Sequence, residues 1–330
     1  MSATLPTSAS HPATSSDPAA TASATVHTLP RANGSGPDAG FAPGGAAIAI
    51  DRVAIELGEG AQRFTALDEV SLKIAPGEFV CLLGPSGCGK STLLGALAGH
   101  LQPTHGQIHV DGQAVHGPHP QRGLVFQQHT LFPWLSAQDN VAFGLKMQGV
   151  PARERRERAR DLLGQVGLQG FETRYPSALS GGMQQRVEIA RVLINQPRVL
   201  LMDEPFGALD ALTRLHMQEL LLSLWARLRT TVVFVTHDID EALFLADRIL
   251  VLSPRPGRIV DDILVREARP RLADWLTSPA FAQLKRHCLH LLRGDPHDDH
   301  HPLPLPRLSP LSEAAVALND AAPASHSRPD

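Results

Sequence analysis

The feature that most constrains this chain is the sequence GPSGCGKST at positions 84–92. It matches the pattern G-x-x-x-x-G-K-[ST], which is typical of a loop that binds phosphate groups. Its glycines let backbone amides approach an anion without interference from side chains. The apolar runs FVCLL and LLGALA stand before and after it, so the local order is strand, loop, helix. Because the N-terminus of a helix attracts negative charge, the stretch predicts a site for the phosphates of a nucleotide.

The whole loop supplies candidate nucleotide ligands. Lys90 has the length to reach the β- and γ-phosphates, and the Ser91 hydroxyl suits Mg²⁺. We interpret Cys88 as a small residue that fits the loop rather than as a redox centre. The three cysteines of the chain are scattered, which fits a reducing compartment. The nucleotide-binding candidates in the loop are Gly84, Pro85, Ser86, Gly87, Cys88, Gly89, Lys90, Ser91 and Thr92.

Composition narrows the classes of protein to which the chain can belong. The formal net charge of the 330 residues is −3, so no strong field favours nucleic acid and we expect no nucleic-acid partner. No apolar run approaches the ~18–20 residues that span a bilayer. The first residues form neither the basic nor the apolar part of a secretory signal. We therefore expect a protein without membrane spans of its own.

Residue types divide the chain into four segments. Residues 1–45 are mostly Ala, Ser, Thr, Pro and Gly and predict a disordered extension. A folded domain is expected over 46–268, and helically spaced apolar residues predict a C-terminal helical segment over 269–294. Residues 295–330 predict a disordered tail. The run HDDHH at 297–301 has residue types that bind Zn or Ni, but an unstructured polar tail is the preferred interpretation.

Apolar periodicity predicts the layers of the folded domain. Alternation at 53–57 and 70–74 indicates antiparallel strands. Short apolar strands then alternate with helical patterns, which indicates a mostly parallel sheet covered on both faces. The strands expected there are 199–202, 231–235 and 249–252, and the helices are 211–227 and 238–246. A helix-rich stretch precedes them, with helices expected at 137–147, 152–166 and 182–194.

Polar residues follow several of these strands. Asp203 and Glu204 end one apolar run, Gln127 ends another and His237 a third. Open α/β sheets bind ligands beyond the carboxyl ends of their strands. We expect Asp203, with Ser91 and Gln127, to hold Mg²⁺. Glu204 is then expected to orient or deprotonate water, and His237 to bond the γ-phosphate. Two acids after a strand can also form a surface turn, and a lone histidine is usually structural. Downstream of a phosphate loop we prefer the catalytic interpretation.

The sequence LSGGMQQR at 179–186 resembles the signature of ABC-transporter ATPases. In isolation its Ser-Gly-Gly turn would be interpreted as a helix cap, although such a turn also offers free amides to an anion. The resemblance covers roughly residues 46–265 and includes the Q-loop at Gln127, the D-loop at Asp210 and the switch histidine at His237. It adds Ser180, Gly181, Gly182 and Asp210 to the candidate nucleotide ligands.

This resemblance implies a fold and an activity. The implied fold class is α/β, a P-loop NTPase (RecA-like) core with a mostly parallel sheet, an antiparallel β subdomain and an α-helical subdomain inserted at about 130–195. The implied activity is hydrolysis of ATP, with Mg²⁺, coupled to transport across a membrane. ATP would lie between the phosphate loop of one copy and the Ser180 turn of a second copy, and hydrolysis by Glu204 would reopen that dimer.

The sequences FPWLS at 132–136 and MDEPFGALDALTR at 202–214 are similar to the nitrate, sulfonate and taurine importer subfamily. The similarity implies an ATPase that energises import of small sulfur- or nitrogen-containing anions, with aliphatic sulfonates or taurine preferred. A nitrate or pyrimidine-precursor importer and a soluble ABC ATPase outside transport are the alternatives.

The same resemblance implies partners and a location. The implied partners are a second ATPase subunit in a homodimer, two integral membrane permease subunits and, indirectly, a periplasmic substrate-binding protein. The protein would bind peripherally at the cytoplasmic face of the bacterial inner membrane. Phe132 and Trp134 allow two interpretations, as apolar anchors for a helix of the permease or as core of the helical subdomain.

One position departs from the family pattern. Near the strand expected at 53–57, the family usually has an aromatic residue just before a glycine, and its ring stacks on adenine. Here the residue before Gly58 is Leu57. Leucine gives apolar contact without π-stacking. Phe64 is a possible substitute. We therefore expect weaker discrimination between ATP and GTP than in a Leu57→Tyr variant.

Overall fold

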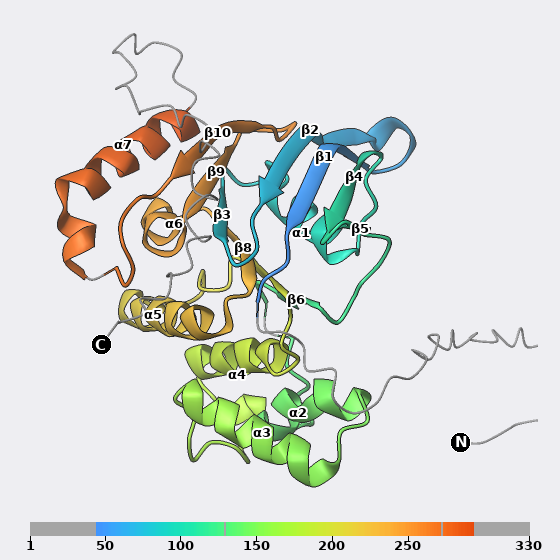
Figure 1. The fold of residues 1–330 in the computed structure, drawn as a ribbon, viewed down its shortest axis with the longest axis vertical. Coiled ribbons are helices and arrows are strands. Elements are labelled where there is room, and N and C mark those ends of the chain that lie inside the picture. Colours follow the sequence, from blue (N-terminus) through green and yellow to red (C-terminus); the bar gives the residue numbers. More distant parts are fainter. Residues whose placement is uncertain (1–43, 129, 272, 294–330) are drawn as a thin grey trace, which may run out of the picture. The chain divides into compact units, whose positions relative to one another are not determined.

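A computed structural model of the protein describes residues 44–128, 130–271 and 273–293. These residues form two β-sheets and a set of helices, drawn in Figure 1. The predicted extensions, apart from residues 44–45, and the histidine-rich run at 297–301 lie outside the described residues, so those segment boundaries stay predictions. No helix in the described part of the chain combines the length and the apolar character needed to cross a membrane.

The larger sheet carries the predicted strand-end residues. Its strand order is β10-β9-β3-β8-β7-β6, and every neighbouring pair is parallel except β10 with β9. Strands β3 and β8 are buried throughout, as the continuous apolar runs of a sheet covered on both faces require. The bounds are β3 Phe79–Leu83, β6 Arg122–Val125, β7 Val199–Asp203, β8 Thr231–Thr236, β9 Arg248–Leu252 and β10 Ile259–Leu264.

The smaller sheet is antiparallel, with the order β2-β1-β4-β5. Its first two strands are longer than the predicted ones. Irregular register between β1 and β2 interrupts the period-two alternation, which is why the sequence pattern revealed only part of each strand. Asp111 and Gly112, with φ of 49° and 74°, form a tight turn between β4 and β5. The bounds are β1 Ile48–Leu57, β2 Phe64–Ile74, β4 His105–Val110 and β5 Gln113–Ala114.

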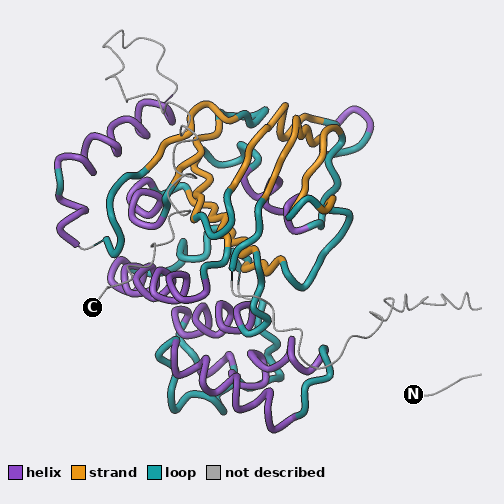
Figure 2. Tube along the Cα trace, in the orientation of Figure 1, coloured by secondary structure: helices purple, strands orange, loops and turns teal. Residues whose placement is uncertain are grey.

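The helices match the predicted ranges closely. The helix expected at 137–147 has those bounds, and each end of the other four expected helices agrees with the structure to within one residue. Helices α2, α3 and α4 pack on one another and form a group of their own in Figures 1 and 2. The bounds are α1 Lys90–Ala98, α2 Ala137–Met147, α3 Ala152–Gln165, α4 Gly181–Leu193, α5 Ala211–Leu228, α6 Ile239–Leu245 and α7 Pro279–Arg293. Short 3₁₀ helices lie at Gly60–Gln62, Pro176–Ala178 and Ala273–Thr277.

Strand β3 divides the hydrophobic core into two clusters. Phe79, Cys81 and Leu83 belong to one cluster, together with residues of α2 to α7. Val80 and Leu82 belong to the other, with α1 and the smaller sheet. Because successive side chains of a strand point to opposite faces, the larger sheet lies between these two layers. The strand that leads into the phosphate loop is thus held from both sides.

Candidate nucleotide site

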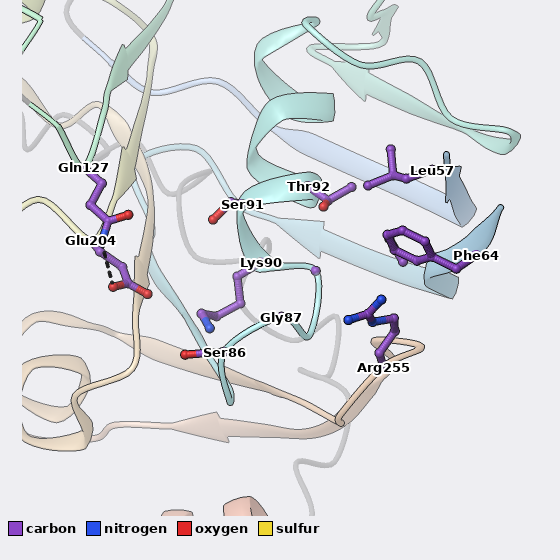
Figure 3. Close-up of a pocket in the computed structure, with 12 residues that line it drawn as sticks. Leu57, Phe64, Ser86, Gly87, Lys90, Ser91, Thr92, Gln127, Glu204 and Arg255 are labelled. Atoms are coloured by element: carbon purple, nitrogen blue, oxygen red, sulfur yellow. Dashed lines mark hydrogen bonds between the residues drawn. The ribbon is translucent and has the colours of Figure 1, made fainter. Parts of the chain in front are cut away.

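The phosphate loop joins β3 to α1. Gly89, with φ of 98°, turns the chain into the helix, and a Cβ at this position would lie 2.6 Å from a methyl of Leu67. The Lys90 side chain is buried, and its Nζ donates to the carbonyl oxygens of Gly84 at 2.8 Å and Pro85 at 3.0 Å. The ammonium group therefore lies inside the curve of the loop (Figure 3), where the sequence predicts phosphate groups.

Strand register brings the other predicted residues to one edge of the larger sheet. Strands β3, β8, β7 and β6 are neighbours and parallel, so their carboxyl ends lie together. The paired residues near that edge are Leu83 with Thr236, Val235 with Asp203, and Met202 with Val125. From this edge the chain continues into the phosphate loop, His237, Glu204 and Gln127.

The Glu204 side chain contacts residues that follow two of the other strands. Its Oε2 lies 3.0 Å from Nδ1 of His237 and accepts from Nε2 of Gln127 at 3.5 Å, a contact drawn in Figure 3. The backbone of Glu204 has φ of 42°, in the left-handed region that residues other than glycine rarely adopt. The Glu204 N–H donates to the Val235 carbonyl oxygen at 2.9 Å. This turn directs the carboxylate away from the strand and towards the two polar partners. A carboxylate held in this way is suited to orient a water molecule.

Asp203 and Ser91 form the second polar pair. The Ser91 hydroxyl donates to Oδ1 of Asp203 at 2.9 Å. Burial raises the pKa of Asp203, and the Glu204 charge raises it further, while the bond from Ser91 and the charge of Lys90 lower it. A hydroxyl and a carboxylate in contact are hard oxygen donors, which Mg²⁺ prefers, so the donor set fits the ion. With Mg²⁺ bound, its charge would favour the ionised carboxylate.

A pocket of about 380 Å³ adjoins the phosphate loop, and the described residues that line it include Ser91 and Glu204 but neither Asp203 nor His237. One end is polar and is lined by the phosphate loop, Gln127 and Glu204. The other end is lined by Leu57, Phe64 and Arg255, which Figure 3 shows grouped beyond Thr92. The two candidates for contact with adenine are paired across the β1–β2 register and so lie at the same end. Sequence reasoning missed Arg255, because it belongs to a loop after β9 that carries no motif.

The remaining predicted ligands lie elsewhere within the chain. Ser180 and Asp210 are N-caps, and their side chains accept from Met183 N–H at 3.3 Å and from Thr213 N–H at 3.1 Å. Among the described residues that line the pocket, none belongs to the 180–182 turn and none is Asp210. Ser180 and Asp210 therefore act as helix caps within the chain. Contact of either residue with a nucleotide stays a prediction, and it requires a second copy of the chain.

Comparison with known proteins places this arrangement in a family. The profile of the family described as ABC transporter matches residues 67–207. The chain is 56% identical over 215 residues to the taurine import ATP-binding protein TauB of Chromobacterium violaceum, covering 65% of this chain and 82% of that protein. TauB of Rhizobium johnstonii is 53% identical over 234 residues, with 69% and 89% covered.

Solved structures agree with this assignment. The ATP-binding cassette MJ0796, in a dimeric post-hydrolysis state bound to ADP and Pi, is 35% identical with a TM-score of 0.61, and the match covers 67% of this chain and all of that one. The predicted P-loop core, antiparallel subdomain and helical segments are confirmed by this fold. The chain belongs to the ABC transporter family and is one of its ATP-hydrolysing, ATP-binding proteins.

Proposed function

We propose that this chain is the ATPase subunit of an importer for small organic sulfonates, with taurine as the first candidate. The observation that carries the proposal is the identity of 56% and 53% to two taurine import proteins, of which the matches cover 82% and 89%. Nitrate and pyrimidine precursors are the competing solutes. An ABC ATPase outside transport is disfavoured by the same similarity.

We further propose that two copies share each nucleotide. The pocket contains the phosphate loop, Gln127 and Glu204 but lacks the Ser180 turn, which lies at the start of α4. The related cassette MJ0796 is dimeric in its ADP- and Pi-bound state. In such a dimer the free amides at the start of α4 would face the phosphates held by the partner, and Mg²⁺ would be held through Ser91, Asp203 and Gln127.

Docking on a membrane permease is proposed for the loop that carries Trp134. The Trp134 residue is 70% exposed, so the alternative of a core position is wrong for this residue. Asn140, which is fully buried, holds the loop: its Nδ2 donates to the carbonyls of Phe132, Leu135 and Ser136 at 3.0–3.1 Å. Trp134 is thus displayed by a rigid loop, as an anchor residue requires.

The same loop is connected to the proposed catalytic region. Arg191 of α4 donates to the Thr130 carbonyl at 2.8 Å and lies 5.5 Å from the Phe132 ring. Thr130 follows Gln127 closely in the sequence, and α4 begins at the Ser180 turn. Movement of a docked permease segment would therefore reach both Gln127 and the proposed partner-facing turn.

Replacing Trp134 with alanine tests the docking proposal. We expect ATP hydrolysis by the isolated subunit to be unchanged and solute uptake by the assembled transporter to fall about tenfold, as for loss of an interface anchor. The free energy of unfolding should change by less than about 1 kcal/mol because the side chain is exposed. Leu264→Ala, on β10 and 45% exposed, is the matched control. Normal uptake by Trp134→Ala would refute the docking role.

Growth of a deletion strain tests the solute. Cells that lack this gene should fail to grow on taurine as the sole sulfur source, and the wild-type gene should restore growth. Growth should be normal on sulfate. If the strain instead fails on nitrate as the nitrogen source, the sulfonate proposal is wrong and the nitrate alternative replaces it. Normal growth under every condition would refute both the sulfonate and the nitrate proposals and leave a pyrimidine-precursor importer or an ABC ATPase outside transport.

A further inference from the structure

The pocket end away from Lys90 contains a stacked pair that the family motifs do not include. The Arg255 guanidinium carbon lies 4.5 Å from the centroid of the Phe64 ring. Both residues are exposed, at 40% for Phe64, and both line the pocket. Figure 3 shows the Arg255 guanidinium next to the Phe64 ring, with Leu57 on the other side of Phe64. The pair therefore presents a cation on an aromatic support at the opening of the nucleotide pocket.

The loop that carries Arg255 is fastened to both neighbouring elements. The N–H of Gly257 donates to the Ala66 carbonyl at 2.9 Å, and the Gly257 carbonyl accepts from Asp68 at 3.0 Å, so the loop is bonded to β2. It also passes directly against the phosphate loop, since a Cβ at Gly257 would lie 2.0 Å from the Cys88 carbonyl oxygen. Within its own turn, Ser253 Oγ donates to the Pro256 carbonyl at 3.0 Å. These contacts hold the backbone of the loop on both sides of Arg255 against β2 and the phosphate loop.

A guanidinium group in this place has a specific chemistry. It is planar, permanently charged and weakly hydrated, and it stacks on flat π-systems. Bases stack on aromatic and guanidinium planes with little dependence on sequence, because every base has a π-face. The N–H groups of a guanidinium lie in its own plane, so a guanidinium that stacks on the face of a base does not reach the donors and acceptors on the edge of that base, which distinguish adenine from guanine. Leu57 supplies apolar contact at the side and no π-face.

We propose that the nucleotide base rests on the Arg255 guanidinium, with Phe64 as its support, and that this pair replaces a single aromatic ring at position 57. The base is then held by stacking on the planar guanidinium, and adenine and guanine bind with similar affinity. This inference depends on nucleotide binding in the pocket and not on the transported solute. Failure of the taurine proposal therefore leaves it unaffected.

Calorimetry with the full chain and three ligands tests the stacked pair. ADP, GDP and inorganic pyrophosphate are suitable because none requires hydrolysis. We expect Arg255→Ala to weaken ADP and GDP binding equally, by about tenfold. Pyrophosphate affinity should be unchanged, because pyrophosphate has no base. Phe64→Ala should give a similar loss, and the double variant should lose less than the product of the two single losses, because the residues act as a pair.

Two further variants separate stacking from charge and from folding. Arg255→Lys keeps the positive charge but loses the planar group, so we expect the same loss as for alanine. Arg63→Ala is the matched control, since Arg63 precedes Phe64 and pairs with Glu56 outside the pocket lining. An equal loss of pyrophosphate affinity in Arg255→Ala would assign the residue to the phosphates and overturn the proposal. Full affinity in Arg255→Ala, full affinity in Arg255→Lys or strong preference for ADP in the wild type would overturn it as well.

Discussion

Glu204→Gln is expected to lower the rate of ATP hydrolysis by roughly 100- to 10,000-fold, the range that a general base contributes. The substitution keeps the shape of the side chain but removes its charge. It leaves an amide beside His237 Nδ1, which lies 3.0 Å from Oε2 in the wild type. ATP binding should persist, because the contacts of Lys90 and Ser91 are unaffected. The ATP-bound dimer should then accumulate, because closure occurs and hydrolysis does not reopen it.

Size-exclusion chromatography with light scattering measures that dimer, and phosphate release measures the rate. Glu219→Gln, at an exposed position of α5, is the control and should behave as the wild type in both assays. A second control is ADP, which should not support the closed dimer of either chain. Hydrolysis by Glu204→Gln at near the wild-type rate would remove Glu204 from the role of base and leave a positioning role only.

The sequence was sufficient for the parallel core because local patterns and topology agree there. Strand β7 is a continuous apolar run over residues 199–202, and its polar residues Asp203 and Glu204 follow directly in the chain. Parallel neighbours then bring these residues to one edge without any further information. The predicted helices were accurate for a similar reason, since Ser136, Ser180, Asp210 and Asp238 mark their starts as N-caps.

The base end of the pocket was only partly predictable, for a physical reason. Leu57 and Phe64 stood out through a family pattern, whereas Arg255 is brought there by backbone bonds between its loop and β2. Such bonds join any residue types and leave no trace in the side-chain pattern. The environment of Trp134 was ambiguous for a different reason: the sequence alone does not distinguish an exposed tryptophan from a buried one.

Ser180→Asp is expected to lower ATP hydrolysis by about 100-fold while leaving nucleotide binding by the single chain unchanged. Aspartate caps a helix as well as serine, so the start of α4 should be kept. Its charge, however, would face the phosphates held by the partner and repel them. Ser180→Asn, an equally good cap without charge, is the matched control and should retain most of the activity. Loss of activity in both variants would point to a defect in packing of α4.

Mixing two inactive chains then tests whether each site is shared. Lys90→Ala removes the ammonium group that binds phosphate in the chain's own loop. Ser180→Asp places a negative charge in the turn that would face the partner's nucleotide. In a mixed dimer, the intact loop of one chain meets the intact turn of the other, so one complete site forms. Half of the dimers formed at random from equal amounts are mixed, so we expect recovery to about a quarter of the wild-type rate. If Lys90 and Ser180 acted on the same nucleotide within one chain, no mixture would regain activity, since every site would carry a defect.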